Sequence, residues 1–194
     1  MNPLKSVTGT IVLGFVVALI VILILGTGAF SLWSAMTWLH VLAGVIWIGL
    51  LYYFNFIQVP AAAEALADSD GPGPAAINKY VAPRALFWFR WGALATWLTG
   101  AATLEAGPFG LMNAFTFSPG VEIIGLGAWL GTIMLFNVWV LIWPNQKKIL
   151  GIVEASAEEI TKGKFVALMA SRTNTFLSIP MLMCMVGQGH GLPF

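Results

Sequence analysis

Two histidines are the residues of this chain best suited to bind a metal ion or a redox cofactor. They are its only imidazoles, and 150 positions separate His40 from His190. His40 lies near the start of a long apolar run, and an ionisable side chain inside a membrane-spanning segment predicts a functional site. Histidine is a common axial ligand of haem iron, singly or with a second ligand. The sequence therefore predicts that His40 binds the iron of haem b, with His190 as the second ligand or as a bystander.

The residues that follow His40 fit a flat ligand. On a helix, His40, Gly44 and Trp47 share one stripe. Gly44 has no side chain, so a planar group can lie close to the backbone there. We therefore predict that Gly44 and Trp47 line the cofactor site. Two simpler interpretations stay open: His40 is hydrogen-bonded to a neighbouring helix, and His190 is an interfacial residue at a helix end.

Two arginines suggest a second site, one for an anion or a substrate. Arg90 and Arg172 each offer a planar guanidinium, which binds carboxylates or an ionised heterocycle through paired hydrogen bonds. Asn174, with Asn137 and Ser178, is predicted to complete such a pocket. The alternatives are that both arginines extend to the lipid headgroups, and that the three smaller polar side chains form hydrogen bonds between helices.

A sulfur-rich patch precedes His190 and raises the question of copper. It consists of Met181, Met183, Cys184 and Met185. Soft sulfur ligands select Cu(I), but only Met181 and Met185 share a helical face. Apolar packing explains the patch better, so copper is the weaker cofactor prediction. The sequence contains no nucleophile triad, phosphate-binding loop or metalloprotease motif, and it identifies no catalytic residue.

The composition indicates an integral membrane protein. Of the 194 residues, 59% are hydrophobic and 9% are charged, whereas soluble domains carry about 25% charged residues. The net charge of +1 and the lack of a basic stripe exclude a nucleic-acid partner. The single cysteine excludes a disulfide framework and a Cys-x-x-Cys-His attachment of c-type haem. We therefore expect no cytochrome c domain in this chain.

Five segments reach the length of about 20 residues that a membrane crossing requires. The predicted fold is an all-α membrane helical bundle, one domain over residues 1–194. Its spanning helices are expected near 9–31, 35–58, 84–105, 120–143 and 165–189. Polar and turn-forming residues predict loops at 59–83 and 106–119. We expect the fourth helix to stop at Pro144, and a short amphipathic helix to lie at the surface within 145–164.

The basic residues predict the orientation of these helices. With the N-terminus in the cytoplasm, every Lys and Arg falls on or toward the cytoplasmic side, and the outer side receives Glu105 and Glu122, in accord with the positive-inside rule. His40 and His190 then share the outer leaflet. In the fourth helix, Gly127 and Gly131 form a small-xxx-small pair, which predicts close packing against another helix.

Four segments of the chain carry a family resemblance. They are Trp38–Gly49, Lys79–Pro83, Asn137–Gln146 and Ser171–Pro180. These segments resemble the membrane domain of PuuD-type urate hydroxylases, the urate oxidase N-terminal family. The segment around His40 is also similar to the wider group of haem- or copper-linked membrane proteins that includes CopD and HemJ. The resemblance extends from about residue 35 to the C-terminus.

The resemblance implies an oxidoreductase that oxidises urate to 5-hydroxyisourate and passes electrons to a C-terminal cytochrome c domain. His40 matches the helix-borne histidine of the family, and His190 matches the histidine after its Ser-Arg-x-Asn-Thr helix. We expect this chain to be shorter than the family's membrane domain and to lack its cytochrome domain, and therefore to use a separate cytochrome c on the periplasmic side.

The predicted function is thus a haem b redox protein of the bacterial inner membrane, either an enzyme or an electron-transfer subunit. The alternative is a non-catalytic accessory subunit of a larger membrane-bound respiratory or oxidase complex.

Overall fold

The computed structural model describes residues 2–26 and 28–193, and every regular element in these two ranges is helical. The all-α prediction is therefore confirmed. The chain divides into two compact units, the first ending at Ser31 and the second beginning at Leu32. The prediction of one membrane domain stays a prediction.

The first unit holds one long helix. A 3-10 turn, η1 (Pro3–Lys5), precedes α1 (Val7–Leu25). Ser6 caps α1, because its hydroxyl accepts the N–H of Gly9 at 3.0 Å. The helix is apolar on every side and buries none of its residues within its unit. At about 1.5 Å per residue its length matches the hydrocarbon core of a bilayer, about 30 Å thick.

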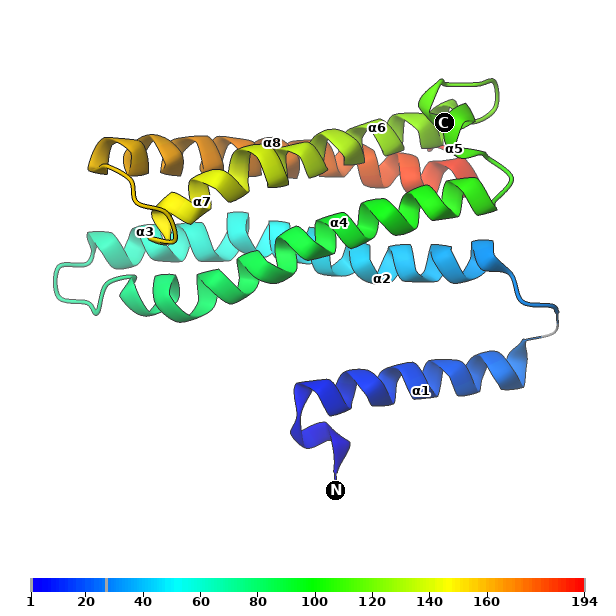
Figure 1. The fold of residues 1–194 in the computed structure, drawn as a ribbon, viewed down its shortest axis with the longest axis horizontal. Coiled ribbons are helices and arrows are strands. Elements are labelled where there is room, and N and C mark those ends of the chain that lie inside the picture. Colours follow the sequence, from blue (N-terminus) through cyan, green and yellow to red (C-terminus); the bar gives the residue numbers. More distant parts are fainter. Residues whose placement is uncertain (1, 27, 194) are drawn as a thin grey trace. The chain divides into compact units, whose positions relative to one another are not determined.

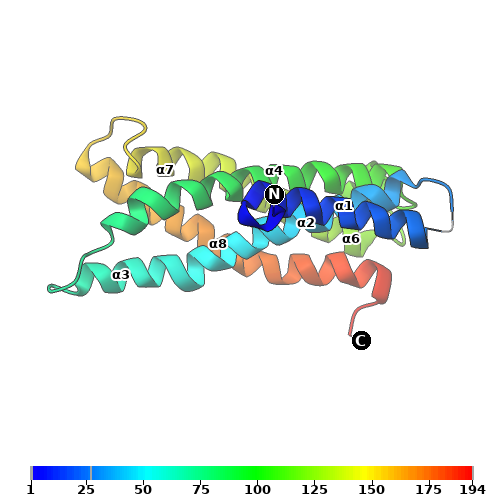
Figure 2. The same ribbon diagram turned by 90° about the horizontal axis from the view of Figure 1, so that it is seen from below.

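The second unit is a bundle of four long helical segments that run along a common direction (Figure 1 and Figure 2). The first consists of α2 (Leu32–Tyr53), η2 (Phe54–Gln58) and α3 (Val59–Ala67); the second of η3 (Ile77–Val81) and α4 (Ala82–Ala106); the third of α6 (Glu122–Phe136), η4 (Asn137–Ile142) and α7 (Trp143–Ile149); and the fourth of α8 (Ala157–His190). A single turn, α5 (Leu111–Phe115), joins the second segment to the third.

Three of these segments contain a π-helical stretch, and a proline follows each stretch at the same distance. The stretches η2, η3 and η4 end two residues before Pro60, Pro83 and Pro144. A proline has no N–H for the carbonyl four residues earlier, and its ring crowds that carbonyl. Widening the preceding turn to the i→i+5 pattern accommodates this misfit while the helix continues.

This accommodation explains the two wrong boundaries of the second and fourth predicted helices. The helix expected to end at residue 58 continues to Ala67, and the helix expected to stop at Pro144 continues to Ile149. Much of the predicted loop at 59–83 is therefore helical. Only a short connection separates Ala67 from Ile77.

The separate amphipathic helix expected within 145–164 is also wrong. These residues are divided among the end of α7, a non-helical connection over 150–156 and the beginning of α8. A capping box fixes the start of α8: Ser156 Oγ accepts the N–H of Glu159 at 3.2 Å, and the Glu159 carboxylate accepts the N–H of Ser156 at 2.9 Å. That carboxylate also lies 2.9 Å from Lys148 Nζ.

Three helices in the described residues are long and apolar enough to cross a membrane. They are Val7–Leu25, Leu32–Ala67 and Glu122–Ile149. A lipid bilayer is therefore the environment that fits the chain. The remaining long segments, which contain α4 and α8, carry more polar residues and do not reach the same hydropathy.

The core of the bundle is dominated by large apolar side chains. Trp47, Leu51, Phe89, Met134 and Val138 are each at most 2% exposed. They come from α2, α4, α6 and η4, and Met181 of α8 belongs to the same cluster, so all four segments contribute to the core.

The predicted close packing at Gly127 is confirmed. A Cβ at this position would lie 3.1 Å from Cys184 Cβ on α8. Gly131 is also buried, but a Cβ there would meet no neighbouring atom within 4 Å. Gly127 therefore lies where α6 closely approaches α8, whereas a side chain at Gly131 would meet open space.

Candidate functional site

His40 lies half-buried on α2 and contacts α4. Its Nδ1 is 2.8 Å from the carbonyl oxygen of Thr96. Because a carbonyl can only accept a hydrogen bond, Nδ1 must be the donor, and in the neutral ring the lone pair is on Nε2. Metal-binding histidines have this arrangement, in which the ring nitrogen that does not bind metal donates to a carbonyl or carboxylate. The same bond is also the helix-to-helix contact of the simpler interpretation.

A glycine on α4 makes room for the His40 ring. A Cβ at Gly100 would lie 2.8 Å from His40 Cε1 and 2.9 Å from Nδ1, closer than side chains approach. Gly44 also faces α4, since a Cβ there would lie 3.8 Å from the methyl carbon of Thr96. Thr96 and Gly100 were not among the predicted site residues. Their sequence signal is the spacing of small residues at Gly92, Thr96 and Gly100, one helical turn apart.

Trp47 is buried at 2% exposure, and its indole N–H has no hydrogen-bond partner among the described residues. Buried polar groups usually have a partner. Trp47 thus provides a donor inside the bundle that is available to an acceptor. Its predicted role in lining a cofactor site stays a prediction.

His190 is the last residue of α8 and is exposed to the surroundings. The helix ends there because Gly191 adopts a positive φ of 83° while its N–H still donates to Gly187. This geometry is that of the interfacial alternative. The role of His190 as second iron ligand is not tested by it and stays a prediction.

The antiparallel course of α2 and α8 gives the two histidines the same height in the bundle. Tyr52 Oη lies 2.9 Å from Ser178 Oγ, and Asn55 Nδ2 donates to Ser171 Oγ at 2.8 Å. His40 is twelve residues before Tyr52, and His190 is twelve residues after Ser178. Both are therefore about 18 Å from the Tyr52–Ser178 contact, measured in the same direction.

The amide of Asn174 is engaged in hydrogen bonds between helices. Asn174 is fully buried, its Nδ2 donates to the carbonyl of Met134 at 3.0 Å, and its Oδ1 accepts from Asn137 Nδ2 at 2.8 Å. Ser178, also fully buried, meets Tyr52. The three small polar residues are thus interhelical partners, the alternative stated for them above.

The two arginines of the predicted anion pocket have different surroundings. The guanidinium carbon of Arg90 lies 3.7 Å from the centre of the Trp143 ring. Arg172 is exposed, whereas Asn174, two residues later and on the opposite face of α8, is buried. The structure therefore does not bring Arg172 and Asn174 into one pocket. Binding of an anion by either arginine stays a prediction.

The sulfur-rich patch is partly in the interior. Met181 and Cys184 are buried, and Cys184 packs against Gly127 of α6. Met183 is exposed. No cluster of three or more His, Cys, Asp or Glu side chains that could hold a metal ion occurs in the described part of the chain. These contacts fit the apolar packing interpretation of the patch.

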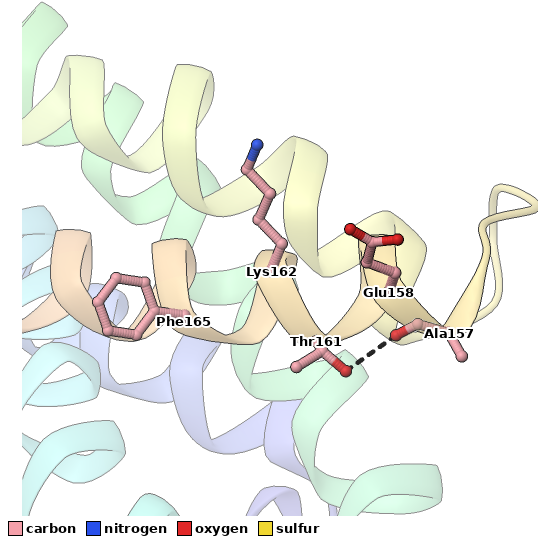
Figure 3. Close-up of a pocket in the computed structure, with 5 residues that line it drawn as sticks. All are labelled: Ala157, Glu158, Thr161, Lys162 and Phe165. Carbon is pink, nitrogen blue, oxygen red and sulfur yellow. Dashed lines mark hydrogen bonds between the residues drawn. The ribbon is translucent and has the colours of Figure 1, made fainter.

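The surface of the described residues has at least two depressions. The first is an open hollow whose lining residues, Ala157 to Phe165, all come from the N-terminal turns of α8 (Figure 3). Because one helix alone forms it, this hollow lacks a second wall and cannot enclose a ligand. The second is an apolar groove of about 440 Å³ between α4 and the α6–η4 segment, which we call the tryptophan groove; its lining includes Trp91, Trp97, Thr132 and Trp139.

Comparison with known proteins adds one finding. A sequence model of the family described as urate oxidase N-terminal matches residues 109–194. The resemblance noted from the sequence is thus confirmed for this part of the chain, which contains α5 to α8 and His190 but not His40. No curated protein and no solved structure matches the chain significantly.

Proposed function

We propose that this chain is a haem b-binding redox protein of the bacterial inner membrane, related to the membrane domain of PuuD-type urate hydroxylases. The geometry of His40 carries the proposal. The bond from Nδ1 to Thr96 leaves Nε2 with its lone pair for iron, and Gly100 gives the ring its space. The family match at residues 109–194 supports urate as the substrate class.

In this proposal, His40 Nε2 would hold the haem iron, and Thr96 and Gly100 fix the orientation of the imidazole. His190, at the same height on α8, would be the second iron ligand, and Gly44 and Trp47 would line the site. Haem bound there supplies one-electron redox chemistry. Ligation by both histidines would suit electron transfer, whereas ligation by His40 alone would suit catalysis.

The charge distribution supports five spanning helices with the N-terminus in the cytoplasm. The end of the bundle formed by α3, α7 and the start of α8 (Figure 1) carries most of the basic residues: Lys79, Arg84, Lys147, Lys148, Lys162 and Lys164. Glu105 and Glu122 lie at the other end, on α4 and α6. By the positive-inside rule the basic end is cytoplasmic. His40 is then on the periplasmic side, within reach of a cytochrome c.

The decisive experiment is a reduced-minus-oxidised spectrum with pyridine haemochrome analysis on the purified full chain. We expect a Soret band in the wild type that is lost in His40→Ala. His190→Ala should shift the band rather than abolish it if His190 is the second ligand. His40→Gln is a useful companion, because its amide can still donate to Thr96 while it removes the imidazole ligand.

A colourless wild-type protein would contradict the proposal. If that protein also co-purified in fixed stoichiometry with a membrane redox complex, the accessory-subunit alternative would be supported instead. Urate consumption by the haem-loaded protein, with and without a soluble cytochrome c, separates an enzyme from an electron-transfer subunit. Metal analysis of the same sample tests the weaker copper prediction.

A further inference from the structure

The tryptophan groove lies on the outside of the bundle, where spanning helices face lipid. Trp91 meets Trp139 edge to face, with ring centres 5.3 Å apart. The indole N–H of Trp97 donates to Thr132 Oγ1 at 2.9 Å, so this polar pair satisfies itself and leaves an apolar surface. The groove lies along Glu122–Ile149, a segment long and apolar enough to cross a membrane. Its walls therefore suit a hydrocarbon chain.

Two cations lie beside one end of this groove. Arg90 directly precedes Trp91, and Trp143 follows Trp139 by one helical turn. The guanidinium carbon of Arg90 lies 3.7 Å from the centre of the Trp143 ring, and Lys147 Nζ lies 5.9 Å from the same centre. Two positive charges thus lie against the Trp143 ring at the basic end of the bundle.

Neither cation has an acidic partner. Within the described residues the only ion pair joins Lys148 to Glu159. The side-chain hydrogen bond of Arg90, to the carbonyl of Leu86, is long at 3.5 Å. Two unneutralised cations next to lipid attract an anion, and basic pockets between spanning helices near the cytoplasmic face suit anionic headgroups.

We propose that this surface binds an anionic phospholipid, with one acyl chain in the tryptophan groove and the phosphate against Arg90 and Lys147. The continuity of the apolar groove with the two cations selects this occupant, because a free phosphate would leave the groove empty and a neutral lipid would leave the charge uncompensated. The proposal does not depend on His40 or on haem.

The test uses the full chain, purified in mild detergent and stripped of lipid. Phosphatidylglycerol, phosphatidylcholine and inorganic phosphate are added separately, and bound lipid is measured by native mass spectrometry together with the unfolding temperature. We expect preferential retention of phosphatidylglycerol, falling about tenfold or more in the double variant Arg90→Gln/Lys147→Gln. The matched control Lys162→Gln/Lys164→Gln removes two exposed basic residues of α8 and should retain the lipid.

Three results would overturn the proposal. Equal lipid retention by the wild type and the Arg90/Lys147 double variant would show that these two residues do not bind the headgroup. If the Lys162/Lys164 control lost as much lipid as the Arg90/Lys147 variant, the lipid would be attracted only by the general positive charge of the surface. Full stabilisation by inorganic phosphate alone means a simple anion site. If the double variant does not fold, Lys147→Gln should weaken retention and Arg90→Lys should preserve it, since the charge remains.

Discussion

His40 Nδ1 donates to the Thr96 carbonyl oxygen across 2.8 Å, and this bond determines which ring nitrogen is free. The acceptor is a backbone carbonyl, so no substitution of the Thr96 side chain removes it. The bond depends instead on how closely α2 approaches α4. Gly100, the residue against which the ring lies, and Gly92, beside Ile46, both allow this close approach.

The first prediction concerns this approach. In Gly100→Ala, the new Cβ would lie 2.8 Å from His40 Cε1, so the ring must move and the bond to Thr96 must weaken. We expect a lower unfolding temperature and, for the haem-loaded protein, a shifted Soret band. The control is Gly49→Ala on α2, where a Cβ meets nothing within 4 Å and helix propensity favours alanine by about 0.5–1 kcal/mol. Equal behaviour of the two variants would show that the ring is not confined.

The sequence was sufficient to predict the all-α fold and one close contact between helices. The apolar runs predicted the helices. The spacing of Gly127 and Gly131 predicted close helix packing, which the structure contains between Gly127 and Cys184. These features are local, because they depend on hydropathy and residue size within a few turns. The helix ends expected at residue 58 and at Pro144 were wrong, because a π-helical turn before Pro60 and Pro144 absorbs the lost hydrogen bond and the helix continues.

The candidate site was only partly accessible from the sequence. His40 stood out as an ionisable residue in an apolar run, but its partner, the Thr96 carbonyl, belongs to the backbone and is 56 positions away. The pairing of Asn137 with Asn174 was one of two interpretations that the residue types allowed. Only the packing of helices far apart in the chain distinguishes between such interpretations.

The second prediction concerns the buried amide pair. Asn174→Ala leaves the Asn137 amide and the Met134 carbonyl without their partner, and should lower the free energy of unfolding by about 1–3 kcal/mol. A double-mutant cycle with Asn137→Ala should give a coupling of about 0.6 kcal/mol, and at most about 1.7 kcal/mol. Unfolding in mixed micelles measures both quantities. Phe176→Ala, at an exposed position two residues away, is the control and should change stability by less than about 0.5 kcal/mol.

The third prediction separates the two glycines of α6. Gly127→Ala forces a Cβ to 3.1 Å from Cys184 Cβ and should destabilise the bundle by about 1–3 kcal/mol. Gly131→Ala adds a methyl group where nothing lies within 4 Å, and should be neutral or stabilising by up to about 1 kcal/mol. We therefore expect Gly127→Ala, but not Gly131→Ala, to lower the free energy of unfolding. Destabilisation by both would mean that α6 and α8 approach each other along their whole contact.

The fourth prediction concerns pH and the charged start of α8. The pKa of the Glu159 carboxyl is lowered, first by the hydrogen bond from the Ser156 backbone and then by Lys148. A folded-state pKa below the unfolded one stabilises the fold above the unfolded pKa, and this stabilisation is lost as the pH falls through the folded pKa.

We therefore expect the N-terminal turns of α8 to loosen as the pH is lowered from about 5 to 3. Amide hydrogen exchange, measured during the exposure to acid, detects this loosening. Tryptic cleavage after Lys162 would miss it, because that digestion is carried out at about pH 8 after the exposure has ended. In Glu159→Gln the titration is absent, so its exchange should differ least from wild type at the acid end of the range and most at pH 5. Glu158→Gln is the control, since Glu158 takes no part in the capping box. A difference between Glu159→Gln and wild type that stays constant across the range would mean that the capping box does not depend on the charge of Glu159.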